Sequence, residues 1–297
     1  MTQTSNKHLL IIGAGYSAGY IGALFLKSGF KVSATTRSDN TVESIKALGF
    51  NPLIIKAGEI QRLPTNISHI VMTAPVAIET EDASWSILAA QITQLKQLEW
   101  LCYLSTTGVY GDQGGALTSE DTPINPISPR AESRITAESK WRELSNRLQK
   151  PLDILRLSGI YGPSRNILRT LIDGNARLII KEGQIFNRCH VEDIASAVHT
   201  AAINMGQNIR VFNVADDTPC SPLEITSYAA QLLKMPIPQK MTFDKAALSP
   251  MARSFYMENK RIDNSALKNE LGVKLKYPDY RQALQDMLKN ELAKKAQ

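Results

Sequence analysis

Residues 9–19 read Leu9-Leu10-Ile11-Ile12-Gly13-Ala14-Gly15-Tyr16-Ser17-Ala18-Gly19. The first four residues form an unbroken apolar run, which is typical of a strand buried on both faces. The residues after Gly15 are apolar or small and predict a buried helix. Gly13 permits the sharp turn at the strand end, Gly15 lets the backbone approach a pyrophosphate, and Ala18 lets the helix pack closely. Because N–H groups at such a helix start attract anions, residues 13–19 predict a dinucleotide site; the alternative is an ordinary tight strand–helix turn.

The composition is that of an ordinary globular protein. The chain has 297 residues, of which 43% are hydrophobic and 21% charged, and Lys plus Arg exceed Asp plus Glu by 34 − 28 = 6. This charge is spread along the chain, which favours anionic ligands and gives no case for nucleic acid. Residues 1–7 contain no signal-peptide core, and no apolar run approaches the length of a membrane span. Cys102, Cys189 and Cys220 have neither disulfide nor metal-ligand spacing. We therefore expect a cytoplasmic protein with no bound metal and no membrane attachment.

Strands alternate with helices along the first half of the chain. Further strands are expected at residues 31–36, 51–56, 69–73, 100–105 and 152–157, with helical segments between them. Such alternation implies right-handed crossovers and a Rossmann-type, doubly wound parallel α/β sheet. Ligands bind at the carboxyl ends of such strands, where Gly13, Arg37, Ala74-Pro75 and Thr106 fall.

The second half of the chain has shorter elements. The pattern predicts a dinucleotide-binding domain over residues 1–157 and a smaller, partly interleaved substrate-binding portion over residues 158–297. Parts of residues 189–216, which include an expected strand at 210–214, are expected to return to the first domain. Residues 112–129 form a loop rich in Gly, Pro and Ser, and Ser128-Pro129 marks the start of the next helix.

Several further motifs follow the order found in one protein family. They are Leu104-Ser105-Thr106-Thr107-Gly108-Val109-Tyr110-Gly111, residues 156–163, His190-Val191-Glu192-Asp193 and Phe212-Asn213-Val214, with Lys260-Arg261, Leu271-Gly272 and Tyr277-Pro278 near the end. Together with the glycine pattern, they resemble the extended short-chain dehydrogenases/reductases of the NAD-dependent epimerase/dehydratase type, and within these the YeeZ-like branch. The resemblance covers nearly the whole chain, and residues 105–111 are its most specific part.

The resemblance implies a catalytic Ser or Thr after the fifth strand and a Tyr-x-x-x-Lys pair on the next helix. Thr106 matches the first of these, and its hydroxyl would hold a substrate carbonyl or hydroxyl in place. The register of residues 130–138 against the family stretch Tyr-Gly-x-Ser-Lys-x-x-Ala-Glu places Arg130 at the tyrosine and Arg134 at the lysine. A guanidinium stays charged and accepts no hydrogen bond, so Arg130 cannot act as a general acid or base. Arg134 can still bind cofactor ribose hydroxyls, as the family lysine does.

Arg130 and Arg134 are like charges one turn apart at the start of a helix. Their mutual repulsion and the helix dipole each oppose this arrangement by about a few tenths of a kcal/mol. A carboxylate or phosphate ligand would relieve both effects, which predicts that Arg130 clamps an anionic group. The alternative is that both arginines are solvated and that Arg134 pairs with Glu138 at i+4.

The end of the second expected strand indicates which dinucleotide binds. Sites that take NAD usually place an acid there, near the ribose 2′-hydroxyl, but residues 34–38 contain no acid before Asp39. Arg37, with Thr36 or Ser38, suits a 2′-phosphate, so NADP is the expected cofactor and NAD the less favoured one. The alternative is that Arg37 is a surface arginine on a loop.

Other residues in family-like turns are candidate substrate contacts: Tyr110, Tyr161, Arg188 and His190. Either tyrosine could replace the missing acid or base if its hydroxyl faces the nicotinamide. The structural alternative is that the tyrosines and the histidine only pack. Trp85, Trp100 and Trp141 are expected in the core.

The sequence therefore predicts an NADP-binding oxidoreductase or epimerase that acts on a small, anionic carbonyl or sugar-type substrate. Its expected partners are that substrate and, in a homodimer, a second copy of the chain. The competing hypothesis is a non-catalytic NADP(H)-binding sensor or interaction protein that has kept the fold and lost the tyrosine, since fold alone does not specify function.

Overall fold

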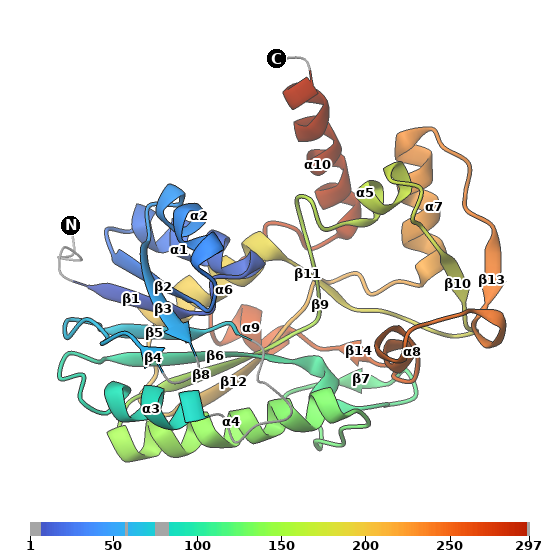
Figure 1. Cartoon of the computed structure of the whole chain (residues 1–297). Helices are drawn as coiled ribbons and strands as arrows, with labels where there is room; N and C mark the ends of the chain where they lie inside the picture. The colour runs from blue at the N-terminus through green and yellow to red at the C-terminus, as the bar shows by residue number, and fades with distance from the viewer. Residues whose placement is uncertain (1–6, 57–58, 75–82, 296–297) are drawn as a thin grey trace.

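The protein, seen in a computed structural model that describes residues 7–56, 59–74 and 83–295, is built on a large sheet (Figure 1). Its strands are β1 (His8–Ile12), β2 (Lys31–Thr36), β3 (Asn51–Lys56), β4 (Glu59–Ile60), β5 (His69–Met72), β6 (Trp100–Thr106), β8 (Leu152–Leu157) and β12 (Ile209–Val214). Their order is β12-β8-β6-β5-β1-β2-β3-β4. All neighbouring strands are parallel except β3 and β4.

Helices cover both faces of this sheet (Figure 1). One face carries α1 (Tyr16–Lys27), α2 (Val42–Ala47) and α6 (Val191–Ile203), and the other carries α3 (Ala83–Ile92) and α4 (Pro129–Leu148). Each face has its own buried apolar cluster, in which side chains of the sheet meet those of the covering helices. The expected Rossmann-type α/β fold is therefore confirmed.

The order of strands places a switch point at β1. From β1 the chain moves outward through β2 and β3, and it then crosses to β5, β6 and β8 on the other side. The chain continues from β1 to β2 on one side and from β5 to β6 on the other, and ligands of doubly wound sheets bind at such a point. The glycine-rich turn that follows β1 lies at this position.

A smaller group of elements is formed mainly by residues after β8. It contains β9 (Gly159–Tyr161), α5 (Ile167–Ile172), β10 (Leu178–Ile180), β11 (Arg188–His190), α7 (Pro222–Leu233), β13 (Lys240–Thr242), α8 (Pro250–Tyr256), β14 (Arg261–Ile262) and α10 (Tyr280–Lys295). Helix α9 (Ser265–Asn269) instead packs against β12, and its Leu267 joins the apolar cluster of the large sheet. Helices α5, α7 and α10 share a third apolar cluster (Figure 1). The chain returns to the large sheet through β12, which pairs with β8, while β14 pairs with β7 (Leu117–Thr118) from the long loop.

Helix α4 starts where the sequence places it. The Ser128 side chain accepts a hydrogen bond from the backbone N–H of Ala131, and Pro129 occupies the first turn. Ala137, Trp141 and Leu144 are buried against the sheet, which fixes the face that α4 presents inward. In the part of the chain that the structure describes, no helix has the length and apolar character needed to cross a membrane.

Candidate functional site

The glycine-rich turn after β1 has a backbone that only glycine fits at its first position. Gly13 has φ +102°, and a Cβ added there would lie 2.7 Å from the Ala74 Cβ and 2.9 Å from its backbone. The Gly13 N–H donates to Thr35 Oγ1 and the Ala14 N–H donates to the Thr35 carbonyl, both at 2.9 Å. The turn is therefore tied to the end of β2 and packed against the end of β5.

Gly15 differs from Gly13 because a side chain at this position would point into open space. A Cβ built on Gly15 meets no atom within 4 Å, and its φ of −92° suits any residue. Helix α1 begins immediately afterwards without a side-chain cap or an acidic residue in its first turn. Among the described residues, the backbone N–H groups of Tyr16 and Ser17 have no hydrogen-bond partner. These features fit a pyrophosphate, which would occupy the open space and accept from the free amides.

A cavity of about 350 Å³ lies beside this turn. Its described wall includes several residues expected to contact a cofactor, namely Gly13, Gly15, Thr36, Arg37 and Ala74. The opposite wall comes from β3, β5, α3 and α4 and includes Ile55, Met72, Trp85, Leu88, Lys140 and Trp141. A cavity with a mostly apolar wall and cations at its edge suits an adenosine with a charged substituent.

The remaining expected cofactor residues have different positions. Ala18 is buried and packs on the sheet, as its close-packing role requires, and Gly19 is partly buried. Pro75 lies outside the described residues. Thr36 shares a hydrogen bond with Thr41 through their hydroxyls and accepts from the Ser38 N–H, which closes the turn that carries Arg37.

Thr106 ends β6 and caps the short helical turn that follows, η2 (Thr107–Tyr110). Its Oγ1 accepts from the Gly108 N–H at 3.1 Å, which leaves the hydroxyl proton available to a ligand. A Cβ added to Gly108 would lie 3.4 Å from Thr106 Oγ1 and 3.9 Å from Glu258 Oε2. The Glu258 carboxylate, which is paired with Lys260 at 2.5 Å, therefore lies beside the same turn. No sequence motif pointed to Glu258.

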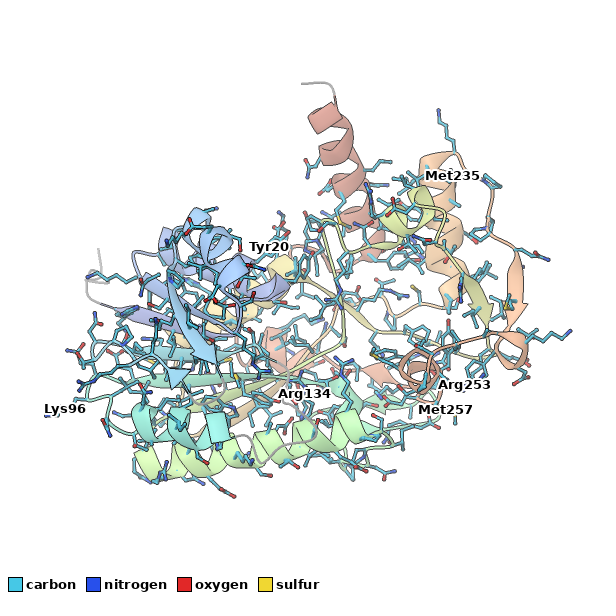
Figure 2. The ribbon with its side chains drawn as sticks, in the orientation of Figure 1. Tyr20, Lys96, Arg134, Met235, Arg253 and Met257 are labelled. Atoms are coloured by element: carbon cyan, nitrogen blue, oxygen red, sulfur yellow. The ribbon has the colours of Figure 1, made fainter. Side chains whose placement is uncertain are left out.

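Arg134 lies between α4 and the sheet (Figure 2). Its Nη1 donates to the Tyr103 hydroxyl at 3.0 Å and to the Leu104 carbonyl at 3.4 Å. Arg130, one turn earlier, contacts the sulfur of Met251 on α8 at 3.6 Å. Burial, followed by the charges of Arg134 and Arg165, lowers the pKa of Arg130. Arg130 is therefore close to two other cations, Arg134 on α4 and Arg165 in the turn after β9.

The alternative in which Arg134 pairs with Glu138 is wrong. Glu138 is buried, and both its carboxylate oxygens accept from Arg156 on β8, at 2.9 and 3.1 Å. Ser105 also donates to Glu138, at 2.6 Å. Among the described residues, no carboxylate forms an ion pair with Arg130 or Arg134.

The candidate substrate residues are held inside the protein. The Tyr110 hydroxyl donates to Asn213 Oδ1 at 2.8 Å and accepts from Arg156 at 2.9 Å, so it is engaged in the core. Tyr161 is 6% exposed and burial raises its pKa, while burial lowers the pKa of His190 to about 4. His190 accepts from the Glu192 N–H at the start of α6, and Arg188 donates to Cys220 and to the Phe186 carbonyl. The structure brings none of these four residues to the described wall of the cavity.

Comparisons with known proteins agree with this architecture. The family model described as "NAD dependent epimerase/dehydratase family" matches residues 35–215, more than half of the chain, and the chain belongs to that family. Protein YeeZ of Escherichia coli K12 is 24% identical over an alignment of 290 residues, which covers 92% of this chain and 97% of YeeZ.

Solved structures share the fold over nearly the whole chain. A functionally unknown conserved protein from Silicibacter pomeroyi DSS is 40% identical with a TM-score of 0.88, covering 95% of this chain and 98% of that one. UDP-glucuronic acid 4-epimerase from Bacillus cereus, solved in complex with NAD, has a TM-score of 0.76 at 17% identity and covers 95% of this chain and 99% of its own. At that identity the likeness shows the fold alone.

Proposed function

We propose that the protein binds a nicotinamide dinucleotide along the carboxyl edge of the sheet and acts as an oxidoreductase or epimerase on a small anionic substrate. The observation that carries this proposal is the open space beside Gly15, together with the free amides of Tyr16 and Ser17. The pyrophosphate fits there, and the adenosine fits the neighbouring cavity. When bound, the nicotinamide supplies a hydride acceptor or donor.

The residues near Thr106 then have distinct tasks. The Thr106 hydroxyl donates to a substrate oxygen, Arg134 holds ribose hydroxyls, and Arg130 binds a negative group of the substrate. Arg130 cannot pass a proton. Glu258 is a carboxylate beside the same turn and could accept one, with Lys260 as its counter-charge.

The proposed cofactor is NADP(H), because Arg37 lines the cavity at the end of β2 and residues 34–38 contain no acid. Arg37→Ala should lower the affinity for NADP+ relative to NAD+ by about tenfold or more, the size of one charge-assisted contact. Calorimetric titration with both dinucleotides measures the ratio. Arg62→Ala, at an exposed arginine outside the cavity wall, is the control. An unchanged ratio in Arg37→Ala would show that Arg37 does not select the cofactor.

The anion site at Arg130 can be tested with two sugar nucleotides that differ by one carboxylate, UDP-glucuronate and UDP-glucose. With dinucleotide bound, Arg130→Ala should reduce the affinity for UDP-glucuronate by about tenfold and change that for UDP-glucose much less. Dinucleotide affinity should change little. Arg147→Ala, an exposed arginine at the far end of α4, is the matched control.

The wild-type protein should show little or no turnover of UDP-glucose, because the residue in the tyrosine register cannot exchange a proton and a neutral sugar gives Arg130 no carboxylate with which to hold the substrate beside Glu258. Robust turnover of this neutral substrate, retained in Arg130→Ala, would contradict both the assignment of Arg130 and the interpretation of the lost tyrosine.

The second candidate function is a non-catalytic NADP(H)-binding sensor. The observation that favours it is the placement of Tyr110 and Tyr161, whose buried hydroxyls cannot serve as the missing acid or base. A sensor would bind dinucleotide in the titrations above and show no turnover with charged or neutral carbonyl compounds. Turnover that depends on Thr106 would exclude it.

A further inference from the structure

The turn that follows β9 is held in one conformation by its own backbone. The Gly162 N–H donates to the Arg165 carbonyl and the Arg165 N–H donates to the Gly162 carbonyl, both at 3.0 Å. Pro163 occupies the second position, and Ser164 the third with φ +62°, a conformation that costs a non-glycine residue about 1 kcal/mol. Asn166 also donates to the Gly162 carbonyl, at 2.9 Å. The direction in which Arg165 leaves the turn is therefore fixed locally.

This turn contacts the first residue of α1. The Tyr16 hydroxyl donates to the Pro163 carbonyl at 2.8 Å, and the Arg165 guanidinium carbon lies 5.9 Å from the centre of the Tyr16 ring. A Cβ on Gly162 would lie 2.7 Å from the Tyr16 oxygen, so glycine is needed for this close approach. Tyr16 also carries one of the two free amides at the start of α1. Arg165 is thus placed next to the expected pyrophosphate position.

Three arginines lie near one another beside this turn: Arg130, Arg134 and Arg165. Arg165 is exposed. It lies close enough to Arg130 for its charge, like that of Arg134, to lower the pKa of Arg130. Among the described residues, none of these three arginines forms an ion pair with a carboxylate. A dinucleotide pyrophosphate carries two negative charges, which would offset the charge that Arg165 places beside the start of α1.

We propose that Arg165 binds the pyrophosphate of the dinucleotide together with the amides of Tyr16 and Ser17, so that the turn at 162–165 forms part of the cofactor site. This inference rests on the proposed dinucleotide binding. Arg165 then contributes a charged contact from outside the sheet domain, and the turn links the smaller group of elements to the occupied cofactor site.

The test compares Arg165→Gln with the wild type. Arg169→Gln is the matched control, because Arg169 is exposed, lines the same surface hollow as Arg165 and pairs with Asp173 one turn later. NADP+ and NAD+ are titrated calorimetrically, and adenosine 2′-phosphate, which lacks the diphosphate, is measured by competition against NADPH fluorescence. Arg165→Gln should bind both dinucleotides about tenfold more weakly and adenosine 2′-phosphate as tightly as the wild type, and Arg169→Gln should match the wild type throughout.

Two results would overturn the inference without contradicting dinucleotide binding by the wild type. The first is dinucleotide affinities in Arg165→Gln within twofold of those of the wild type, and the second is an equal loss of affinity for both dinucleotides and adenosine 2′-phosphate. If the wild type binds neither dinucleotide, the proposed function itself fails, and the inference fails with it. Equal thermal unfolding midpoints of the three proteins exclude a folding defect.

Discussion

Gly15→Val is expected to abolish dinucleotide binding and to leave the protein folded. The Gly15 backbone has an extended φ of −92°, which valine adopts without strain, and the position of a Cβ there is free of protein atoms within 4 Å. The valine methyl groups would therefore occupy the space needed by the pyrophosphate rather than push on the protein. Calorimetric titration should show no measurable binding, and the thermal unfolding midpoint should stay close to that of the wild type.

Gly13→Val provides the contrast two residues earlier. There φ is +102° and the new Cβ would lie within 3 Å of Ala74, so the substitution should destabilise the protein itself. Valine at the two glycines of one motif is thus expected to have different effects: loss of dinucleotide binding at Gly15 and loss of folding stability at Gly13. Unchanged dinucleotide affinity in Gly15→Val would show that no pyrophosphate passes over this turn.

The sequence predicted local features well because each depends on consecutive residues. An apolar run that ends at a glycine defines both β1 and its turn, and the Ser128-Pro129 pair defines the start of α4. The strands expected up to residue 157 are all present, and the position of Arg37 at the end of β2 follows directly from the length of that strand.

Contacts between distant residues could not be predicted in the same way. The rule for i and i+4 side chains offered Arg134 as the partner of Glu138, but the buried Arg156 from another element takes that place. The Tyr16 hydroxyl meets Pro163 from 147 positions away. Apolar periodicity also does not separate core from cavity wall. Trp85 and Trp141 pack in the apolar cluster beneath α3 and α4, as expected, and both also line the cavity.

A buried ion pair lies behind the first turns of α4, from which the two arginines of the candidate site project. Arg130 and Arg134 project from the first turns of α4, and the register of α4 on the sheet is fixed further along by Glu138. Glu138 is joined to β8 by Arg156 and to β6 by Ser105, and Arg156 continues the network to Tyr110 and Asn213. The two arginines of the site are therefore positioned by a buried ion pair that touches neither of them.

Arg156→Met should strongly lower the free energy of unfolding of this protein. Burial opposes the charge of Arg156, but its hydrogen bonds to Glu138 and the charge of that carboxylate raise the pKa of Arg156 above its ordinary value. Both side chains are less than 5% exposed. Methionine at position 156 leaves the Glu138 carboxylate buried without a counter-charge, which costs about 3–5 kcal/mol. The thermal unfolding midpoint should fall by on the order of 10 °C.

The double variant Arg156→Met/Glu138→Leu separates the loss of the pair from the burial of a lone charge. Replacing both partners by apolar residues removes the unpaired carboxylate, so the double variant should recover most of the lost stability, and the coupling energy should exceed about 1 kcal/mol. If the double variant is as unstable as the sum of the single ones, the two side chains act independently and the ion pair does not hold α4 on β8. If stability returns but Arg130 no longer discriminates UDP-glucuronate from UDP-glucose, the pair serves to orient the start of α4, because the fold would then persist without the register that places both arginines.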